Sequence, residues 1–398
     1  MAIGARSAAA DVSWPPELAV VLASARTRLS TERAARLRAL CQQPLDWERV
    51  IAAARRHGVD PLLQRHLDAI GAPPVPAAVL DRLRAHAEIN GVRNRMLGAE
   101  LAKVLDRLES IGVAAMPYKG PVLAALVYGD LALRRSADLD VLVRRADVLR
   151  SKAALAELGY APRLQLTRAQ ERAYLATQCE YALDRARGRL TVEIHWDVAP
   201  RDFAFQFDLA RLWGGARLAE ATGIAVRVPA PEDALLMLVV HGTKHLWERL
   251  GWLVDIAEFT DAHPDLDWPA LLARAGERGG ARMLRVALAL AADLLEARVP
   301  ARVRREADRD AAVGPLAARV ASWLVGGRPA ARSLPALRAH AALRERRRDR
   351  AALFLRSALT PTVEDWTSIR LPAGLLPAHY VLRPFRLAAK RVAALWAS

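Results

Sequence analysis

The chain has 398 residues, of which 53% are hydrophobic and 26% are charged, a balance typical of globular proteins. It is long enough for two or three domains. No apolar run reaches the roughly 18 to 20 residues that a membrane-spanning helix needs, which excludes a transmembrane protein. The first residues lack the apolar stretch of a signal peptide, and Cys41 and Cys179 are too few for a disulfide scaffold. We therefore expect a soluble protein of the cytoplasm.

A net charge of +16 favours polyanionic partners such as nucleic acids, since basic side chains neutralise phosphates. Only five of the 59 basic residues are lysines, however, and arginines scattered among many alanines can also reflect a compositional bias. The charge is densest near the C-terminus, where residues 331–398 hold thirteen basic and four acidic side chains. The charge alone does not choose between a polyanion site and a bias.

Residues 1–112 show a helical pattern, with apolar residues recurring at spacings of three and four. Within this N-terminal helical region, residues 76–111 form either one long helix or two helices in line, because Gly91 weakens the helix in its middle. The pattern changes at residue 113, where a different domain is expected to begin.

Strands and helices mix only between residues 113 and 228. The helices are expected at 121–128 and 146–158. The strands are expected at 113–118, 139–143, 180–183, 190–196 and 224–228. The turn-rich segment 184–189 predicts that the strands on either side of it form an antiparallel hairpin.

Residues 229–357 again predict helices, beginning at Pro231, whose fixed φ suits the first turn of a helix. Residues 358–398 form a basic tail, which four prolines are expected to break into short pieces: Pro361, Pro372, Pro377 and Pro384.

Asp138 and Asp140 stand two residues apart at the start of an expected strand. This spacing places both carboxylates on one face of the strand, while Leu139 and Val141 point to the other. Two neighbouring carboxylates repel each other unless a cation or a proton lies between them, and oxygen ligands of this kind suit Mg²⁺. The alternative is a solvated turn at a strand edge. The spacing favours a metal site.

Glu193 supplies a third acid, between Val192 and Ile194 on a second expected strand. If the two strands are neighbours, the three carboxylates can bind two ions roughly 3.5 to 4 Å apart, an arrangement that serves in-line phosphoryl displacement. One ion would activate an attacking hydroxyl, and the other would hold a triphosphate and stabilise the departing pyrophosphate. Taken alone, a glutamate on a strand is more often a surface residue.

Lys119 and Gly120 lie between an expected strand and an expected helix. At such a position glycine permits close approach of the backbone, the helix amides favour an anion, and the lysine can reach a phosphate. This pair is therefore a candidate nucleotide-binding segment.

A polar stripe is expected in the next helical region, where His241, Lys244, His245 and Glu248 are spaced to share one helix face. The stripe either contacts substrate or forms hydrogen bonds at a domain junction. His241 and His245 also have the spacing of a zinc-protease helix, but Gly242 stands where such an enzyme has its catalytic glutamate. The sequence therefore argues against a zinc protease.

In their order along the chain, these motifs resemble those of the uncharacterised nucleotidyltransferases of the DNA polymerase β-like superfamily. The superfamily at large has Gly-Gly or Gly-Ser after its first strand, whereas this chain has Lys119-Gly120. The segments that carry the resemblance are Lys119-Gly120, Tyr128-Gly-Asp-Leu-Ala-Leu-Arg134, Asp138-Leu-Asp-Val-Leu-Val143, Glu193-Ile-His-Trp196, Pro231-Glu-Asp-Ala-Leu-Leu236, His241 to Asp255 and Leu382-Arg-Pro384.

The resemblance implies an α+β fold, with a small mixed β-sheet and flanking helices as the nucleotidyltransferase core, followed by a helical domain that helps to form the substrate cleft. Arg134 occupies the family's arginine position, where its fork of donors is expected to contact phosphate. The substrate-side candidates are His195, His241 and Lys244. The implied metal ligands and catalytic carboxylates are Asp138, Asp140 and Glu193.

These features predict a metal-dependent nucleotidyltransferase that uses Mg²⁺ or Mn²⁺ and transfers a nucleoside monophosphate from an NTP to a hydroxyl or phosphate. Catalysis would consist mostly of positioning and charge neutralisation, with Glu193 as a candidate proton acceptor. The acceptor is unidentified and is a small molecule, a peptide or protein, or an RNA.

Two alternatives stay open. One is a toxin-like transferase that acts on tRNA. The other is a basic module on a degenerate transferase fold, which would bind RNA or an anionic membrane surface through an amphipathic C-terminal helix. Clustered carboxylates favour an enzyme over this module, because a binder of polyanions gains nothing from them. The interleaved apolar and basic residues of that helix are Leu382, Arg383, Phe385, Arg386, Leu387, Lys390, Arg391 and Trp396.

Overall fold

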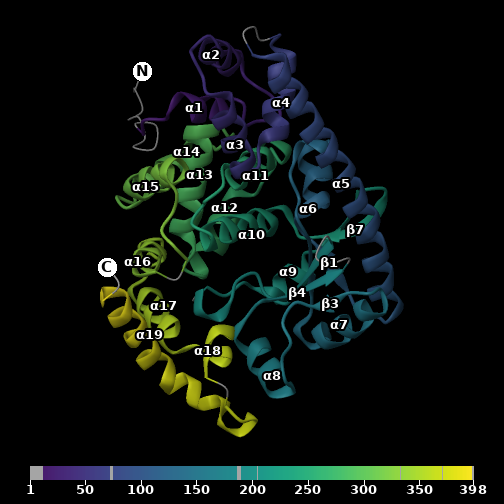
Figure 1. Cartoon of the computed structure of the whole chain (residues 1–398), viewed down its shortest axis with the longest axis vertical. Coiled ribbons are helices and arrows are strands. Elements are labelled where there is room, and N and C mark those ends of the chain that lie inside the picture. Colours follow the sequence, from purple (N-terminus) through teal and green to yellow (C-terminus); the bar gives the residue numbers. More distant parts are fainter. Residues whose placement is uncertain are drawn as a thin grey trace.

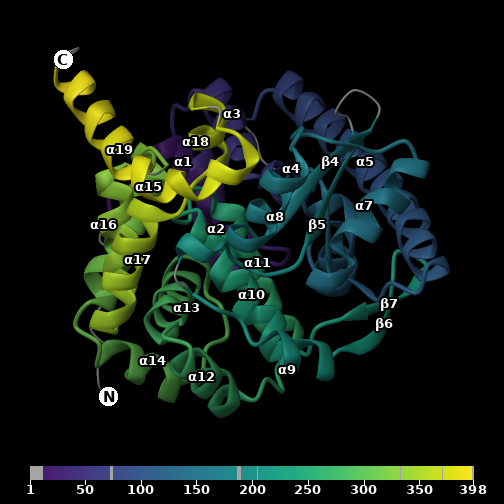
Figure 2. The ribbon, with the colours of Figure 1, turned by 90° about the horizontal axis from the view of Figure 1, so that it is seen from below.

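A computed structural model of the chain describes residues 12–71, 75–185, 190–203, 205–331, 333–369 and 371–396, the last six by their backbone alone. Helices surround one small sheet and a two-stranded ribbon, as Figure 1 and Figure 2 show. The α+β fold class predicted from the sequence is confirmed. No helix in these ranges is long and apolar enough to cross a membrane.

The five-stranded sheet has the strand order β1-β2-β5-β4-β3. Strand β2 runs parallel to β5, and the other neighbouring pairs are antiparallel, so the sheet is mixed, as predicted. A separate antiparallel ribbon pairs β6 with β7. The strands are β1 (Ala115–Pro117), β2 (Leu139–Val143), β3 (Ala161–Pro162), β4 (Glu180–Arg185), β5 (Leu190–His195), β6 (Arg217–Ala221) and β7 (Ile224–Val228).

The predicted hairpin is confirmed by the antiparallel register of β4 and β5. The middle of its predicted turn, residues 186–189, lies outside the described residues. All five residues of β2 are buried, because helices cover the sheet. The helices and helical turns of this region are α6 (Gly120–Leu123), the π-helical turn η1 (Ala124–Tyr128), the 3-10 turns η2 (Leu131–Leu133), η3 (Arg145–Asp147) and η4 (Arg201–Phe203), α7 (Val148–Glu157), α8 (Arg168–Thr177) and α9 (Leu209–Gly214).

Helix α8 was not predicted, although Thr167 and Gln170 form a capping box at its start, a pattern that the sequence displays. The N-terminal region is helical, as predicted, and residues 76–111 hold one helix rather than two. Gly91 lies within it and faces Ala132, where an added Cβ would approach the Cβ of Ala132 to 3.3 Å. The N-terminal helices are α1 (Pro16–Ala23), α2 (Thr31–Cys41), α3 (Trp47–His57), α4 (Asp60–Ala69) and α5 (Ala77–Ser110).

The helices after the sheet follow one another to the C-terminus. Pro384 lies inside the last helix rather than breaking it, so the prediction of a wholly fragmented tail was wrong at this residue. The elements are α10 (Pro231–Lys244), α11 (Leu250–Ala262), α12 (Trp268–Glu277), α13 (Ala281–Leu295), α14 (Ala301–Asp308), α15 (Val313–Gly326), α16 (Leu334–Ala342), α17 (Arg347–Leu359), α18 (Val363–Ser368), the 3-10 turn η5 (Ala373–Ala378) and α19 (His379–Trp396).

Two buried clusters organise the molecule. One surrounds the sheet and includes residues of α5 and α7. The other joins α1–α4 to α10–α15, so helices that precede the sheet in the sequence and helices that follow it share one core. Arg26 links these helices directly, because its guanidinium pairs with Glu258 (2.6 Å) and Asp261 (2.7 Å) of α11. The four units 1–112, 113–228, 229–357 and 358–398 stay a prediction.

Candidate active site

The paired strands β2 and β5 bring the predicted carboxylates together. In the parallel register, Asp140 is the partner of Glu193, and Asp138 immediately precedes β2. Asp140 is buried, whereas Asp138 and Glu193 are partly exposed. Because side chains alternate along a strand and the register pairs Asp140 with Glu193, the three acids share one face of the sheet, where a ligand can reach two of them.

His195 lies within this carboxylate centre. It stands two residues after Glu193 on the same face of β5, and its Nε2 is 3.0 Å from Asp140 Oδ1 and 3.5 Å from Glu193 Oε2. Asp140, Glu193 and His195 each offer a ligand atom, and these atoms lie within 4.8 Å of one another. His195 was predicted on the substrate side, and the structure places it against the carboxylates.

Lys119 and Gly120 contact the same centre from the turn between β1 and α6. Lys119 Nζ lies 2.8 Å from Asp140 Oδ1 and 3.3 Å from His241 Nδ1. Gly120 adopts a φ of +58°, and an added Cβ there would lie 3.2 Å from the carbonyl oxygen of Asp138. Glycine thus permits the backbone to pass beside Asp138.

The two aspartates differ in electrostatics although they are two residues apart. Burial raises the pKa of Asp138 to about 6, and the neighbouring charge of Asp140 adds to this effect. Burial acts on Asp140 in the same direction, but Lys119 and His195 outweigh it and hold the pKa of Asp140 well below its usual range. Asp138 has no hydrogen bond or ion pair with any other described residue, so its charge is uncompensated by a direct partner.

His195 is held as a cation by the acids around it. Burial lowers its pKa, but hydrogen bonds to Asp140, Cys179 and Glu193 outweigh burial and hold the pKa well above 6.5. The hydroxyl oxygen of Tyr118 lies 3.2 Å from His195 Nδ1. The imidazolium therefore bridges Asp140 and Glu193.

Glu180 is a site residue that the sequence analysis missed. It is the antiparallel partner of His195 across β4 and β5, and its Oε2 lies 3.7 Å from His195 Nδ1 and 3.2 Å from Lys244 Nζ. Burial would raise its pKa, but Lys244 and His195 lower it to about 2. The signal was available in the predicted hairpin, since its register sets Glu180 opposite His195.

The predicted polar stripe holds only in part. Helix α10 ends at Lys244, and Leu246 and Trp247 adopt positive φ angles of 52° and 53°. Glu248 therefore leaves the helix face and pairs with Arg328, which corrects the prediction for Glu248. The Trp247 ring fills the space beside Gly242, where an added Cβ would lie 2.2 Å from it.

The two histidines of the stripe and Lys244 stay near the carboxylate centre. The rings of His241 and His245 lie 4.8 Å apart between centroids, and both contact Trp252. Burial and the neighbouring Lys119 hold the pKa of His241 well below 6.5. A neutral His241 can therefore accept a hydrogen bond from Lys119 and orient its ammonium.

Arg134 is anchored by Asp255 of α11. Its Nε and Nη2 lie 2.7 and 2.9 Å from the two carboxylate oxygens, and the Tyr128 hydroxyl donates to the same Asp255 at 2.6 Å. Arg134 Nη1 lies 3.4 Å from the carbonyl oxygen of Gly120. Asp255, also missed as a partner, fixes the loop before β2 to the helical region. Phosphate contact by Arg134 stays a prediction.

Two large cavities lie near this centre, one lined by the two residues that precede Asp138 and the other by Glu180 and Lys244. The first has a volume of about 1090 Å³ and is called the basic cleft because six arginines line it: Arg55, Arg56, Arg93, Arg135, Arg249 and Arg328. Ser136 and Ala137, which precede Asp138, also line it. The second, of about 1310 Å³, is called the C-terminal cavity; it includes Glu180 and Lys244 and extends to residues of α16, α17 and α19. Arg328 and Ala331 line both cavities, which therefore adjoin each other.

Comparison with known proteins assigns the sequence that forms this site to a family. A family model described as uncharacterised nucleotidyltransferase matches residues 43–296, more than half of the chain. The matched segment spans α3 to α13 and includes the carboxylates, Lys119 and the helices α10 and α11. No curated protein and no solved structure gave a match. The chain therefore belongs to the uncharacterised nucleotidyltransferase family.

Proposed function

We propose that the chain is a metal-dependent nucleotidyltransferase, which transfers a nucleoside monophosphate from an NTP to a hydroxyl or phosphate of an acceptor. The observation that carries this proposal is the register of Asp140 with Glu193, with Asp138 beside them. Three acids on one face of the sheet repel each other, so the arrangement is stabilised when a cation lies between them. Membership of a nucleotidyltransferase family supports the same reaction class.

The donor set fits a divalent cation. Asp138, Asp140 and Glu193 would hold it through carboxylate oxygens, the ligands that Mg²⁺ and Mn²⁺ prefer. Asp138 supports this assignment, because among these three acids it is the one whose side chain has no hydrogen bond or ion pair with a described residue, and its pKa is raised to about 6. When bound, such a cation neutralises phosphate charge and activates the attacking oxygen.

The other residues of the centre bind and orient. Lys119 supplies a positive charge at Asp140, and the neutral His241 holds its ammonium in place. His195 lies between Asp140 and Glu193 and fixes their separation. Arg134, pinned by Asp255, supports the Gly120 carbonyl and hence the turn that passes Asp138. These contacts set the carboxylates before substrate arrives, which is how positioning contributes to catalysis.

The alternative of a basic C-terminal binding helix receives less support. Its basic side chains pair with two acids of α18: Arg383 and Arg386 with Asp365, and Lys390 with Glu364. Paired cations attract a polyanion or an anionic membrane weakly. Arg391 and Trp396 have side chains outside the described part.

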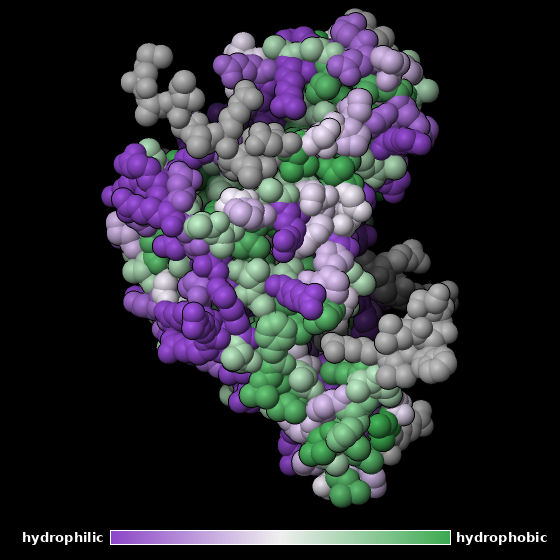
Figure 3. All heavy atoms as spheres, turned by 90° about the vertical axis from the view of Figure 1, so that its left-hand side faces the viewer, coloured by the Kyte–Doolittle hydropathy of each residue, from purple (hydrophilic) through white to green (hydrophobic). Residues whose placement is uncertain are grey.

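Apolar side chains do lie exposed near this helix, and Figure 3 shows them gathered over the lower part of the face that carries α17–α19. They are Phe354, Leu355, Leu375, Tyr380, Val381 and Phe385. A neutral apolar patch is not a polyanion site, so it does not favour RNA as its partner.

The experiment that tests the proposal is thermal unfolding of the protein with ATP, CTP, GTP or UTP, each with and without Mg²⁺. We expect at least one triphosphate to stabilise the protein only when the metal is present. A ligand at about a hundred times its Kd stabilises by about 2.7 kcal/mol. The stabilisation should vanish in Asp138→Asn, Asp140→Asn and persist in Asp106→Asn, which alters an exposed acid of α5 that forms no ion pair with a described residue. No shift with any of the four nucleotides would contradict the proposal.

A further inference from the structure

The basic cleft contains more positive than negative charge. Its acids are Asp60 and Glu248. Its arginines come from α3, α5, the loop before β2, the segment between α10 and α11, and the segment after α15. They are Arg55, Arg56, Arg93, Arg135, Arg249 and Arg328.

Both acids of the cleft are already paired. Asp60 Oδ1 lies 3.3 Å from Arg135 Nη1, and Glu248 pairs with Arg328. The other four arginines, Arg55, Arg56, Arg93 and Arg249, have no carboxylate within ion-pair distance among the residues that the structure describes. Four positive charges therefore face the cleft without a compensating acid.

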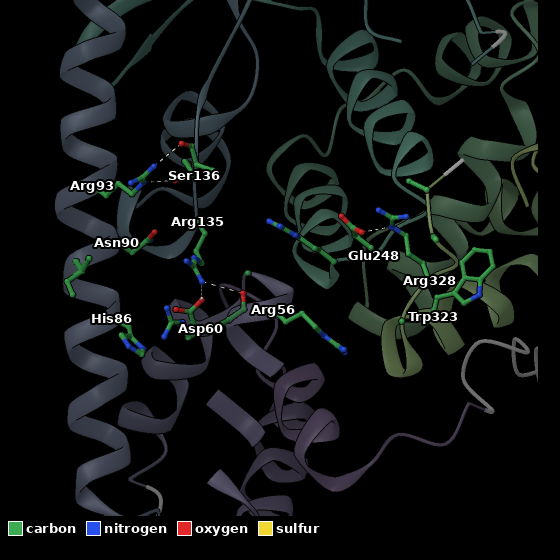
Figure 4. A pocket seen from close by; sticks show the side chains of 18 of the residues that line it. Arg56, Asp60, His86, Asn90, Arg93, Arg135, Ser136, Glu248, Trp323 and Arg328 are labelled. Carbon is green, nitrogen blue, oxygen red and sulfur yellow. Dashed lines mark hydrogen bonds and ion pairs between the residues drawn. The ribbon is translucent and has the colours of Figure 1, made fainter. Parts of the chain in front are cut away.

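The cleft reaches the chain segment that immediately precedes the carboxylate centre. Arg93 donates hydrogen bonds to the carbonyl oxygens of Ser136 (3.2 Å) and Ala137 (2.8 Å), the two residues before Asp138. Figure 4 shows Arg93 and Arg135 on one side of the cavity and Glu248 and Arg328 on the other. A ligand in the cleft would thus meet arginines on both sides, together with Ser136 and Ala137, the two residues before Asp138.

We propose that the basic cleft binds the triphosphate of the nucleotide, an inference that rests on the proposed function. A triphosphate carries three to four negative charges at neutral pH, which matches the four unpaired arginines. Guanidinium groups bind phosphate oxygens in pairs of parallel hydrogen bonds. The cavity volume of about 1090 Å³ slightly exceeds the usual range of small-molecule sites, roughly 300 to 1000 Å³, so a whole nucleotide fits.

Assigning the basic cleft to the triphosphate also gives each of the two substrates, the nucleotide and the acceptor, a cavity of its own. With the triphosphate in the basic cleft, the C-terminal cavity receives the acceptor, beside Glu180 and Lys244. That cavity also holds apolar residues such as Leu334, Leu337 and Phe354, and its surplus of positive charge is smaller than that of the cleft. Its five basic side chains, Lys244, Arg328, Arg383, Arg386 and Lys390, stand beside three acids, Glu180, Asp202 and Glu364. The two substrates then approach the carboxylates from adjoining cavities.

The test is calorimetric titration of tripolyphosphate, and separately of ATP, into the full-length protein with Mg²⁺. The variant is Arg55→Ala, Arg249→Ala, because both side chains are exposed and neither has an ion pair with a described residue to lose. The matched control is Arg36→Ala, Arg38→Ala, which removes two exposed arginines of α2, outside the cleft. Unchanged thermal unfolding without ligand confirms that each variant folds.

The cleft assignment predicts that the Arg55, Arg249 variant binds both ligands at least about tenfold more weakly, since one charged hydrogen bond accounts for about that factor. The α2 control should bind like the native protein. If the native protein binds ATP and the cleft variant binds it equally well, the assignment is wrong while the proposed function stands. If the native protein binds neither ligand, both fail.

A fluorescent single-stranded RNA oligonucleotide supplies a further arm, read by anisotropy. The assignment predicts that tripolyphosphate competes for the cleft at least as well as this RNA. If the cleft variant loses RNA binding and keeps tripolyphosphate binding, the cleft is a nucleic-acid site, and the assignment to the triphosphate is overturned.

Discussion

The carboxylate centre at β2 and the acidic pair of α18 hold similar side chains but match their charges differently. In α18, Asp365 accepts hydrogen bonds from the backbone N (2.7 Å) and Oγ1 (2.8 Å) of Thr362 and pairs with Arg383 and Arg386. At β2, Asp138 has no such partner in the described residues, and its pKa is raised to about 6. The carboxylate of Asp365 therefore completes a structural network, whereas that of Asp138 is available for a ligand.

The same difference, between side chains that have partners within the protein and side chains that do not, applies to the arginines of the basic C-terminal segment. Arg344 is 1% exposed and stacks on the Phe203 ring with its Cζ 4.3 Å from the ring centroid. Arg346 and Arg350 donate to backbone carbonyls. These three arginines thus serve packing and hydrogen bonding, whereas the four unpaired arginines of the basic cleft come from three separate segments of the chain. The density of charge along a sequence therefore does not locate a polyanion site. The site is marked by the basic side chains that have no acidic partner in the folded protein.

The largest expected effect is on Asp365. The Asp365→Ala variant leaves the buried Arg383 without its acid, and breaking a buried ion pair costs about 3 to 5 kcal/mol. Urea unfolding measures this loss. Glu364→Ala is the control, because Glu364 is 53% exposed and a surface pair contributes at most about 1 kcal/mol. Equal losses in both variants would contradict the network.

Asp138→Asn should act in the opposite direction on the metal-free protein. Removing the charge relieves its burial and its repulsion with Asp140, so the free energy of unfolding should rise by about 1 to 3 kcal/mol at pH 7.5, at 1.36 kcal/mol per pKa unit. The measurement is urea unfolding in a chelator, with Asp106→Asn as the control. A destabilised Asp138→Asn would show that Asp138 is a structural residue like Asp365.

Gly120→Ala tests how the backbone beside Asp138 is held. At a φ of +58° an alanine costs about 1 to 2 kcal/mol, and its Cβ would also approach the Asp138 carbonyl oxygen. Gly314→Ala is the control, since Gly314 lies in α15 with no positive φ and no atom within 4 Å of an added Cβ. Thermal unfolding separates the two, and equal effects would mean that the turn adjusts freely.

The smallest effect is the pH dependence of the Asp138→Asn difference. The folded-state pKa of Asp138 lies above its unfolded value of 3.8, so the carboxyl destabilises the native protein progressively as pH rises from 3.8 through 6. The stability advantage of Asp138→Asn should therefore grow between pH 5 and pH 7 and become constant above. Urea titrations at pH 5, 6, 7 and 8 measure it, and a difference independent of pH would contradict the raised pKa.

The sequence predicted the local elements of the site well. Leu139–Val143 was predicted as a strand with its observed limits, because apolar residues frame Asp140 in an alternating pattern. The hairpin of β4 and β5 followed from two strand-like runs around a turn-rich segment. These features depend on neighbours in the sequence, which is why periodicity reveals them.

Long-range contacts were beyond such reasoning. The pairing of Arg134 with Asp255 joins residues 121 positions apart, and nothing in either segment specifies the other. The place of His195 between Asp140 and Glu193 depends on β2 lying parallel beside β5. The end of α10 was missed because the Trp247 ring folds back on Gly242, a tertiary contact that overrides the helical spacing of Glu248.

The central claim is that the centre at β2 and β5 binds a divalent cation. Titration of the protein with Mn²⁺, followed by the loss of the free-ion signal in electron paramagnetic resonance, tests it without nucleotide or acceptor. The account predicts saturable binding that Asp138→Asn, Asp140→Asn weakens at least about tenfold, since a charged contact accounts for about that factor, while Asp106→Asn leaves it unchanged. Equal Mn²⁺ binding by the native protein and the double variant would contradict the account.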